Sequence, residues 1–395
     1  MLNPPTPDDT IYLDHAATTP VDAEVLAVML PFFSQHYGNP SSIYRLGQDA
    51  RAALDRARSS IARVLGCQAD EILFTSGATE SNNLALAGMV RHLPRGATPP
   101  HVVTTRIEHH AVLSAAEVLE AEGVAVSYVP CDSDGIVSAA DIAAALRPET
   151  CLISVMYANN EVGAIQPIAA IGAVAKERGI PFHTDAVQAA GTLPVRVNDL
   201  NVDLLALSAH KFYGPKGIGV LYIRRQTPIS YQQRGGSQEG GRRGGTENVP
   251  LIVGMAAALE KADWLRDAYV TRCRGLRDRL WNRIHEAIPD ATMNGPADGD
   301  HRLPNNLNLA IPGVQGETVL LGLDMEGVAA SAGSACTTGN SEPSHVLRAM
   351  GLSDDRCRAS LRFTVGRDNT IEQVDEAAEI LVETVSRVRS LAGVA

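Results

Sequence analysis

From residue 71 onward, short apolar runs alternate with stretches in which apolar residues recur every three or four positions. The first pattern is typical of buried strands, and the second of helices with one apolar face. The predicted strands are residues 72–74, 101–105, 124–129, 151–156, 181–184, 202–207 and 219–223. This alternation predicts a mainly parallel sheet with helices on both faces, and such sheets bind ligands beyond the carboxyl ends of their strands.

Helical patterns dominate on either side of this region. Two amphipathic helices are predicted before the first strand, at roughly residues 22–36 and 44–65, with Gly66 as a C-cap. A long helix is predicted from about residue 249 to 288. The predicted elements after it are strand 307–310, helix 317–324, strand 361–365 and helix 370–391. We therefore expect an α/β fold with a large domain, residues 16–262, and a smaller α+β domain, residues 1–15 and 263–395.

Composition narrows the class of protein. The chain has 395 residues, of which 45% are hydrophobic, enough for one large core and a second smaller one. A net charge of -11 argues against a nucleic-acid partner. No apolar run is long enough to cross a bilayer, and the first nine residues lack the pattern of a secretory signal. The six cysteines form no C-x-x-C pair, which argues against a zinc site or a disulfide framework and fits the reduced cytoplasm.

The most informative stretch is residues 208–211, Ser-Ala-His-Lys, which follows a predicted buried strand. A lysine at the edge of a sheet lies in partly dry surroundings, where desolvation lowers its pKa and makes it a usable nucleophile. Its simplest chemistry is a Schiff base with an aldehyde cofactor, commonly pyridoxal phosphate (PLP). Lys211 and Lys216 are the two lysines predicted in loops. Taken alone, the stretch would sooner indicate a solvated surface lysine.

Asp185 ends another predicted strand. A carboxylate at that position is what a pyridine nitrogen needs as a partner, because the ion pair keeps the nitrogen protonated. Gln188 could reach the same plane with its amide. The alternative is that Asp185 merely caps the next helix.

Residues 75–83 follow a strand and open a helix, with Gly77 allowing close approach of the backbone. The free N–H groups of a helix start attract phosphate. The side chains that could complete a phosphate cup are Thr79, Ser208, His210 and Thr246. The alternative is an ordinary capping box formed by Thr75 or Ser76 with Thr79 or Glu80.

His109 and Asn160 also follow predicted strands. The imidazole of His109 could stack on a cofactor ring, and a core or helix-leading histidine is the alternative. The amide of Asn160 could bind the ring hydroxyl of the cofactor or a substrate carboxylate, and a turn asparagine is the alternative.

Cys336 lies in a run of small residues, 331–340, which can neither bury the thiol nor hold a regular element. An exposed thiol is reactive when a base or a cation lies near, although a harmless loop cysteine fits as well. Arg362 stands inside a predicted apolar strand. Such a guanidinium requires a carboxylate, either an internal one or that of a substrate.

With these residues in view, the sequence resembles the cysteine desulfurases, PLP enzymes of fold type I in the class-V aminotransferase group. The resemblance runs from Tyr12 to at least Gly366. Its motifs stand in family order at residues 13–20, 38–42, 75–80, 108–109, 159–161, 183–188, 208–211, 243–248 and 334–337. Residues 334–337 and 342–350 look like the nitrogen-fixation and housekeeping branch. Ala209 departs from the pattern, since glycine is common there, and a small residue should be tolerated.

The resemblance implies a large domain with a mainly parallel, seven-stranded sheet, the cofactor PLP and the substrate L-cysteine. Lys211, Cys336 and His109 would be catalytic, and Asn160 and Arg362 would bind the substrate. The cofactor would contact Ala78, Thr79, His109, Asn160, Asp185, Gln188, Ser208, His210 and Lys211. Thr246 would reach the phosphate in the neighbouring subunit of a homodimer.

The resemblance also implies a route for sulfur. Cys336 would attack the sulfur of the bound cysteine, giving alanine and an enzyme persulfide, and would pass the sulfur to an iron–sulfur scaffold or another acceptor. No resident metal is expected, although Cys336 could transiently ligate an iron–sulfur cluster. Three alternatives stay open: a selenocysteine lyase, an aminotransferase of the same family, and a non-catalytic sulfur-relay protein of the same fold.

Overall fold

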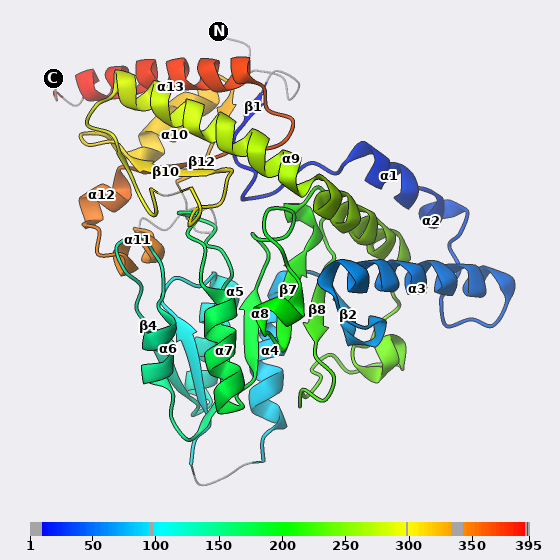
Figure 1. Cartoon of the computed structure of the whole chain (residues 1–395). Coiled ribbons are helices and arrows are strands. Elements are labelled where there is room, and N and C mark those ends of the chain that lie inside the picture. The colour runs from blue at the N-terminus through cyan, green and yellow to red at the C-terminus, as the bar shows by residue number, and fades with distance from the viewer. Residues whose placement is uncertain (1–9, 95–97, 298, 333–342, 392, 394–395) are drawn as a thin grey trace.

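The computed structural model describes residues 10–94, 98–297, 299–332, 343–391 and 393, and Figure 1 shows their arrangement. Its main element is a seven-stranded sheet in the order β2–β8–β7–β6–β5–β3–β4. Strand β8 runs antiparallel to β2 and β7, and the other pairs are parallel. The strands are β2 (Ile72–Thr75), β3 (His101–Thr105), β4 (Ala125–Val129), β5 (Thr150–Ser154), β6 (Phe182–Asp185), β7 (Leu204–Ser208) and β8 (Gly219–Ile223). The predicted mainly parallel sheet is confirmed.

Each face of this sheet has its own hydrophobic core. Successive side chains of a strand point to opposite faces, and in β7 Leu205 and Leu207 pack in one core while Leu204 packs in the other. Helices cover both faces, as the alternating pattern predicted. They are α3 (Arg45–Leu65), α4 (Ala78–His92), α5 (His110–Ala121), α6 (Ala139–Ala145), α7 (Ile168–Arg178) and α8 (Val197–Leu200).

A second, smaller sheet has the order β12–β10–β9, and β1 (Ile11–Tyr12) pairs with β11 (Val328–Ala329). Helix α9 (Val249–Ala287) joins the two regions, as Figure 1 shows: Leu259 packs in the core of the large sheet and Cys273 in that of the small one. The domain boundary after residue 262 stays a prediction. The remaining elements are β9 (Thr292–Met293), β10 (Asn306–Ala310), α10 (Gly316–Met325), α11 (His345–Ala349), α12 (Asp354–Arg358), β12 (Ser360–Thr364) and α13 (Ile371–Leu391).

The N-terminal helices differ in one respect from the prediction. The single helix predicted over residues 22–36 is wrong, because the chain forms α1 (Ala23–Met29) and then α2 (Pro31–Ser34). Pro31 lacks an N–H group and suits the first position of a new helix. The Gly66 C-cap of α3 is confirmed, with a left-handed φ of 69°.

Among the helices that the structure describes, none combines the length and the apolar character needed to traverse a lipid bilayer.

Candidate active site

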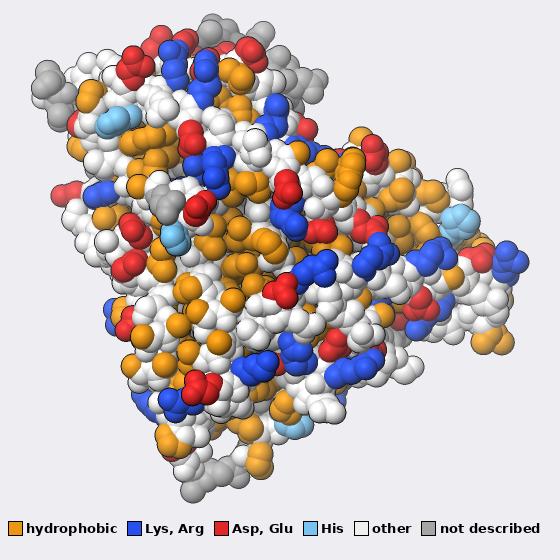
Figure 2. Space-filling view, in the orientation of Figure 1, with side chains coloured by type: hydrophobic (Ala, Val, Ile, Leu, Met, Phe, Trp, Pro, Cys, Tyr) orange, Lys and Arg blue, Asp and Glu red, His pale blue; other side chains and the backbone are white. Residues whose placement is uncertain are grey.

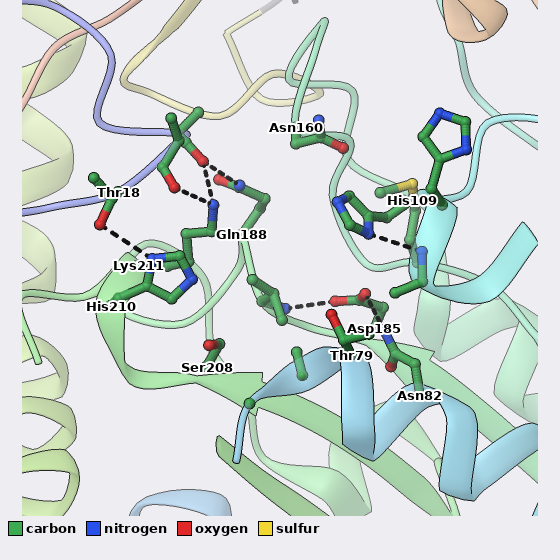
Figure 3. A pocket seen from close by; sticks show the side chains of 18 of the residues that line it. Thr18, Thr79, Asn82, His109, Asn160, Asp185, Gln188, Ser208, His210 and Lys211 are labelled. Atoms are coloured by element: carbon green, nitrogen blue, oxygen red, sulfur yellow. Dashed lines mark hydrogen bonds between the residues drawn. The ribbon is translucent and has the colours of Figure 1, made fainter. Parts of the chain in front are cut away.

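A cavity of about 630 Å³ lies at the carboxyl ends of the central strands, and Figure 3 shows its lining. The side chains enter it directly after β2, β3, β5, β6 and β7, which is where a sheet of this kind binds ligands. The predicted site residues that line it are Ala78, Thr79, His109, Asn160, Asp185, Gln188, Ser208, His210, Lys211 and Arg362. Thr246 does not line this cavity, and Cys336 lies outside the described residues.

Lys211 ends a short 3-10 turn, Ala209–Lys211, at the carboxyl end of β7. Its Nζ donates hydrogen bonds to the carbonyl oxygens of Ala16 and Ala17 at 2.6 and 2.7 Å. Ala209 is fully buried, and a Cβ at Gly214 would lie 2.8 Å from its side chain. The small residue therefore fits at position 209, and packing around it fixes the turn that carries the lysine.

Asp185 is the last residue of β6 and is buried. Its Oδ2 accepts a hydrogen bond of 2.6 Å from the amide of Asn82, and its Oδ1 accepts one of 3.0 Å from the backbone N–H of Val187. Each carboxylate oxygen thus has a fixed donor, and Figure 3 shows the pair of side chains together. Asn82 was not among the predicted site residues, although it stands one helical turn after Ala78 on the same face of α4.

The start of α4 forms one end of the cavity. Its N-cap is Gly77, which has no capping side chain, so the complete capping box is not formed. One half of it is present, because the carboxylate of Glu80 accepts a hydrogen bond of 2.7 Å from the backbone N–H of Ser76. The first amides of a helix have no intrahelical acceptor and attract anions. Thr79 and Ser208 line the same cavity.

His210 is a neutral group at this cavity. Its Nδ1 lies 3.1 Å from the hydroxyl of Thr18. Burial, assisted by the charges of Lys211 and Lys216, lowers its pKa to about 4. The imidazole is therefore uncharged at neutral pH and offers hydrogen bonds rather than charge.

His109 is the N-cap of α5, and its Nδ1 accepts a hydrogen bond of 3.0 Å from the backbone N–H of Ala111. An imidazole that accepts at Nδ1 carries its proton at Nε2 when it is neutral. Burial lowers the pKa of His109 below its usual value; Asp185 opposes this shift and Lys211 adds to it. The ring is therefore an uncharged, flat group with one N–H donor.

Arg362 reaches the cavity from β12 of the small sheet and is 2% exposed. Its Nη2 pairs with Asp14 at 2.6 Å, and its Nη1 donates to the carbonyl oxygen of Asn160 at 3.0 Å. The internal carboxylate that a buried arginine requires is therefore Asp14. This ion pair fixes the guanidinium at the cavity wall.

The segments on both sides of residues 333–342 are attached to this wall. Ser331 forms two backbone hydrogen bonds with Arg362. Ser344 donates to Glu161 at 2.5 Å, and the Nε2 of His345 donates to the carbonyl oxygen of Glu108 at 2.9 Å. These contacts were not predicted, because they join residues far apart in the sequence and no local pattern signals them.

Comparisons with known proteins agree on one family. The family model described as aminotransferase class-V matches residues 11–377. The chain is similar to "Cysteine desulfurase IscS" of Dictyoglomus turgidum, with 46% identity over 96% of this chain and 96% of that protein. Among solved structures it is similar to "NIFS-LIKE PROTEIN", with a TM-score of 0.89 and 36% identity over 96% of this chain and 100% of that one. It is also similar to "SspA in complex with cysteine", with a TM-score of 0.79 and 37% identity over 91% of this chain and 99% of that one.

Proposed function

The chain belongs to the class-V aminotransferase family, and on that premise we propose that its cavity uses PLP to remove the sulfur of L-cysteine. The protein is a PLP-dependent cysteine desulfurase, which forms L-alanine and leaves the sulfur on the enzyme as a persulfide. One observation carries the assignment to this cavity: a lysine and a buried carboxylate with two fixed donors line the same space as the other predicted cofactor contacts.

The residues present fit PLP. The cavity offers an amine at Lys211, a carboxylate at Asp185 and a helix start at Ala78 for the phosphate. When bound, PLP supplies an aldehyde that combines with amines and a ring that withdraws electrons. The first amides of α4 would attract the phosphate, and the neutral His210 would offer it a hydrogen bond rather than a charge.

Residues of the cavity lining would each have a role in the reaction. Lys211 would bind the cofactor covalently and then move protons at the substrate's α-carbon. Asp185 would hold a proton on the pyridine nitrogen, and the fixed donors at both of its oxygens keep its carboxylate in place. His109 would contact the ring with an uncharged imidazole. Gln188 and Asn160 would contact the ring hydroxyl of the cofactor and the side of the ring on which the substrate binds.

The proposal is tested by product analysis. With L-cysteine, PLP and a reductant, the protein should release sulfide and alanine in equal amounts without an added oxo acid. Alanine that appears only when an oxo acid is supplied would indicate an aminotransferase instead. Desulfuration is also separable from selenocysteine lysis by comparing the kcat/KM values of the two substrates.

Arg362 is proposed to bind the carboxylate of L-cysteine, because its guanidinium is held at the cavity wall by Asp14 and Asn160. Arg362→Lys keeps the charge but loses the two-pronged geometry that fits a carboxylate. We expect KM for cysteine to rise about 10-fold or more, since hydrogen bonds to charged groups contribute about 1.5–3 kcal/mol. Arg356→Lys is the control, because Arg356 lines a different cavity. An unchanged KM in Arg362→Lys would remove Arg362 from substrate binding.

Cys336 is proposed to receive the sulfur. It lies five residues after Ser331, whose backbone is bonded to that of Arg362. Five residues span at most about 18 Å, and Arg362 itself lines the cavity. On the other side, His345 also lines the cavity, nine residues after Cys336. Both attachments therefore permit the thiol to reach a bound substrate.

A homodimer is proposed on two grounds. Thr246 is exposed and does not line the cavity of its own chain. Helices α1 and α2 and the N-terminal part of α3 project from the body of the molecule in Figure 1, and Figure 2 shows exposed hydrophobic side chains over α1 and α2. Large apolar side chains exposed on this arm are Leu26, Val28, Leu30, Phe33, Tyr37, Ile43 and Tyr44. Several large apolar side chains exposed on one projecting arm favour a protein interface there.

Mixed dimers test the shared site. Thr246→Ala should weaken PLP binding about 10- to 100-fold if its hydroxyl binds the charged phosphate. A dimer of one Thr246→Ala chain and one Lys211→Ala chain holds one site with both Lys211 and Thr246. That site should regain tight PLP binding, measured by absorbance titration after co-expression. If the mixed dimer binds PLP no more tightly than Thr246→Ala alone, Thr246 does not act across subunits.

The acceptor and the compartment are also proposals. Cys336 would pass its sulfur to an iron–sulfur scaffold protein in the cytoplasm. The five described cysteines, Cys67, Cys131, Cys151, Cys273 and Cys357, are free thiols, which supports a reducing compartment.

A further inference from the structure

Glu108 lies directly behind the wall of the cavity and has no part in the function proposed above. It is fully buried and stands between the end of β3 and the start of α5. It does not line the cavity, but four residues around it do: His109, Met156, Asp185 and His345. A side chain in this place can set the positions of cavity residues without touching the substrate.

The two carboxyl oxygens of Glu108 differ in their hydrogen bonds. Its Oε1 accepts from the hydroxyl of Thr105 and from the backbone N–H of Met156, both at 2.8 Å. Among the described residues, its Oε2 is buried and has no hydrogen-bond partner. Its backbone carbonyl accepts from Nε2 of His345. The side chain therefore joins the end of β3 to the segment after β5, and its backbone joins both to α11.

An ionised carboxylate is poorly accommodated in this position. A buried charge is tolerated when it is paired and fully hydrogen-bonded. No cation is bonded to Glu108 among the described residues, and the nearby charge of Asp185 has the same sign. A proton on Oε2 removes the charge while leaving both hydrogen bonds to Oε1 intact. Consistent with this, burial raises the pKa of Glu108 to about 8, a shift that Asp185 increases and the two donors reduce.

We propose that Glu108 is a positioning residue that holds its proton on Oε2 and, as a neutral acid, fixes His109 and Met156 without placing a second negative charge beside Asp185. Asp185 then remains an undisturbed partner for a cationic group in the cavity. Three titratable groups lie next to this position: Asp185 on β6, whose charge acts on Glu108, His345 on α11, which donates to its backbone carbonyl, and His109, the next residue in the chain. Its catalytic consequence rests on the function proposed above, whereas its protonation does not.

Two substitutions distinguish a protonated Glu108 from an ionised one. Glu108→Gln has the shape and charge of the protonated side chain, and its amide oxygen can still accept from Thr105 and Met156. Glu108→Ala leaves both of those donors without an acceptor. Glu239→Gln is the matched control, because Glu239 is also buried but is paired with Arg58 at 2.5 Å and also accepts from the N–H of Phe74. The same substitution should therefore have opposite effects at the two positions.

The first experiment is urea unfolding of the cofactor-free protein between about pH 5 and pH 8. A buried acid with a raised pKa stabilises the fold fully below its ordinary pKa and loses that contribution as pH rises toward the folded value. Relative to wild type, the urea midpoint of Glu108→Gln should therefore increase as pH rises from about 5 to about 8. Glu239→Gln should lie below wild type throughout this range. If Glu108→Gln also lies below wild type, with no increase, Glu108 is ionised and the proposal is wrong.

The second experiment observes the proton directly. Infrared spectroscopy of the cofactor-free protein at neutral pH should show the C=O stretch of a protonated carboxyl group, and Glu108→Gln should lack it. A spectrum that is the same in both proteins would overturn the proposal.

Activity then tests the positioning role. The kcat should fall at least 10-fold in Glu108→Ala and be restored to within about twofold of wild type in Glu108→Gln. If Glu108→Gln is as slow as Glu108→Ala, the negative charge is required. Loss of desulfuration in every protein, wild type included, would instead count against the proposed function.

Discussion

Lys211→Ala is expected to abolish both turnover and the visible absorbance that PLP acquires when it is bound to a lysine. The amine has no substitute in the turn Ala209–Lys211, and its position depends on two backbone carbonyls that bind Nζ. Loss of a group with the two roles proposed for Lys211, covalent binding of the cofactor and proton transfer, should reduce kcat by about 10³-fold or more. Absorbance spectra of the purified protein and steady-state sulfide release measure the two effects.

Lys216→Ala is the control for this prediction. Lys216 also lines the cavity, yet it is exposed and stands five residues further along the loop. Its removal should leave the visible absorbance intact. If Lys216→Ala loses the absorbance and Lys211→Ala keeps it, the cofactor is bound to the other lysine. If both keep it, neither lysine carries the cofactor.

The position of Lys211 could be predicted because strand endings are visible in the sequence. Residues Leu204–Ser208 form a fully buried strand, and the loops after parallel strands all lie at the same edge of the sheet. The same argument placed Asp185, His109 and Asn160 in one cavity. The sequence predicted the large sheet well for the same reason: buried strands appear as short, continuous apolar runs.

Contacts between distant residues had no such signal. Asn82 binds Asp185 across 103 positions of the chain, and Asp14 binds Arg362 across 348. The buried position of Glu108 depends on segments from β3, β5 and α11 that meet only in the folded chain. The two-residue strands β1, β9 and β11 are too short to show a period, so tertiary pairing alone defines them.

The pKa values of the five described cysteine thiols distinguish them from a reactive thiol. Burial raises the pKa of Cys67 and Cys273 to about 12 and that of Cys131 and Cys151 to about 11, and it also raises the pKa of Cys357. These five thiols are therefore protonated at neutral pH, and a protonated thiol is a poor nucleophile. By elimination among the six cysteines of the sequence, Cys336 is the remaining candidate to receive sulfur.

Cys336→Ala is accordingly expected to keep the visible absorbance of bound PLP and to lose persulfide formation. In the proposed reaction the Cys336 thiolate would attack the substrate sulfur and form the S–S bond. The carbon–sulfur bond would break, its electron pair would stay with carbon, and that carbon would take up a proton to give alanine. Without the thiolate, sulfur has no acceptor and alanine release should fall by orders of magnitude. Mass spectrometry after one addition of cysteine should show one extra sulfur atom on wild type and none on the variant.

Cys151→Ala is the matched control, because it removes a half-buried thiol from β5 with the same substitution. It should gain the extra sulfur atom as wild type does, since burial keeps that thiol protonated. The two variants thus distinguish a specific acceptor from general thiol chemistry. A Cys336→Ala protein that still releases alanine at the wild-type rate would mean that the sulfur leaves by a route without this thiol. In that case the short attachments at Ser331 and His345 would have no role in catalysis.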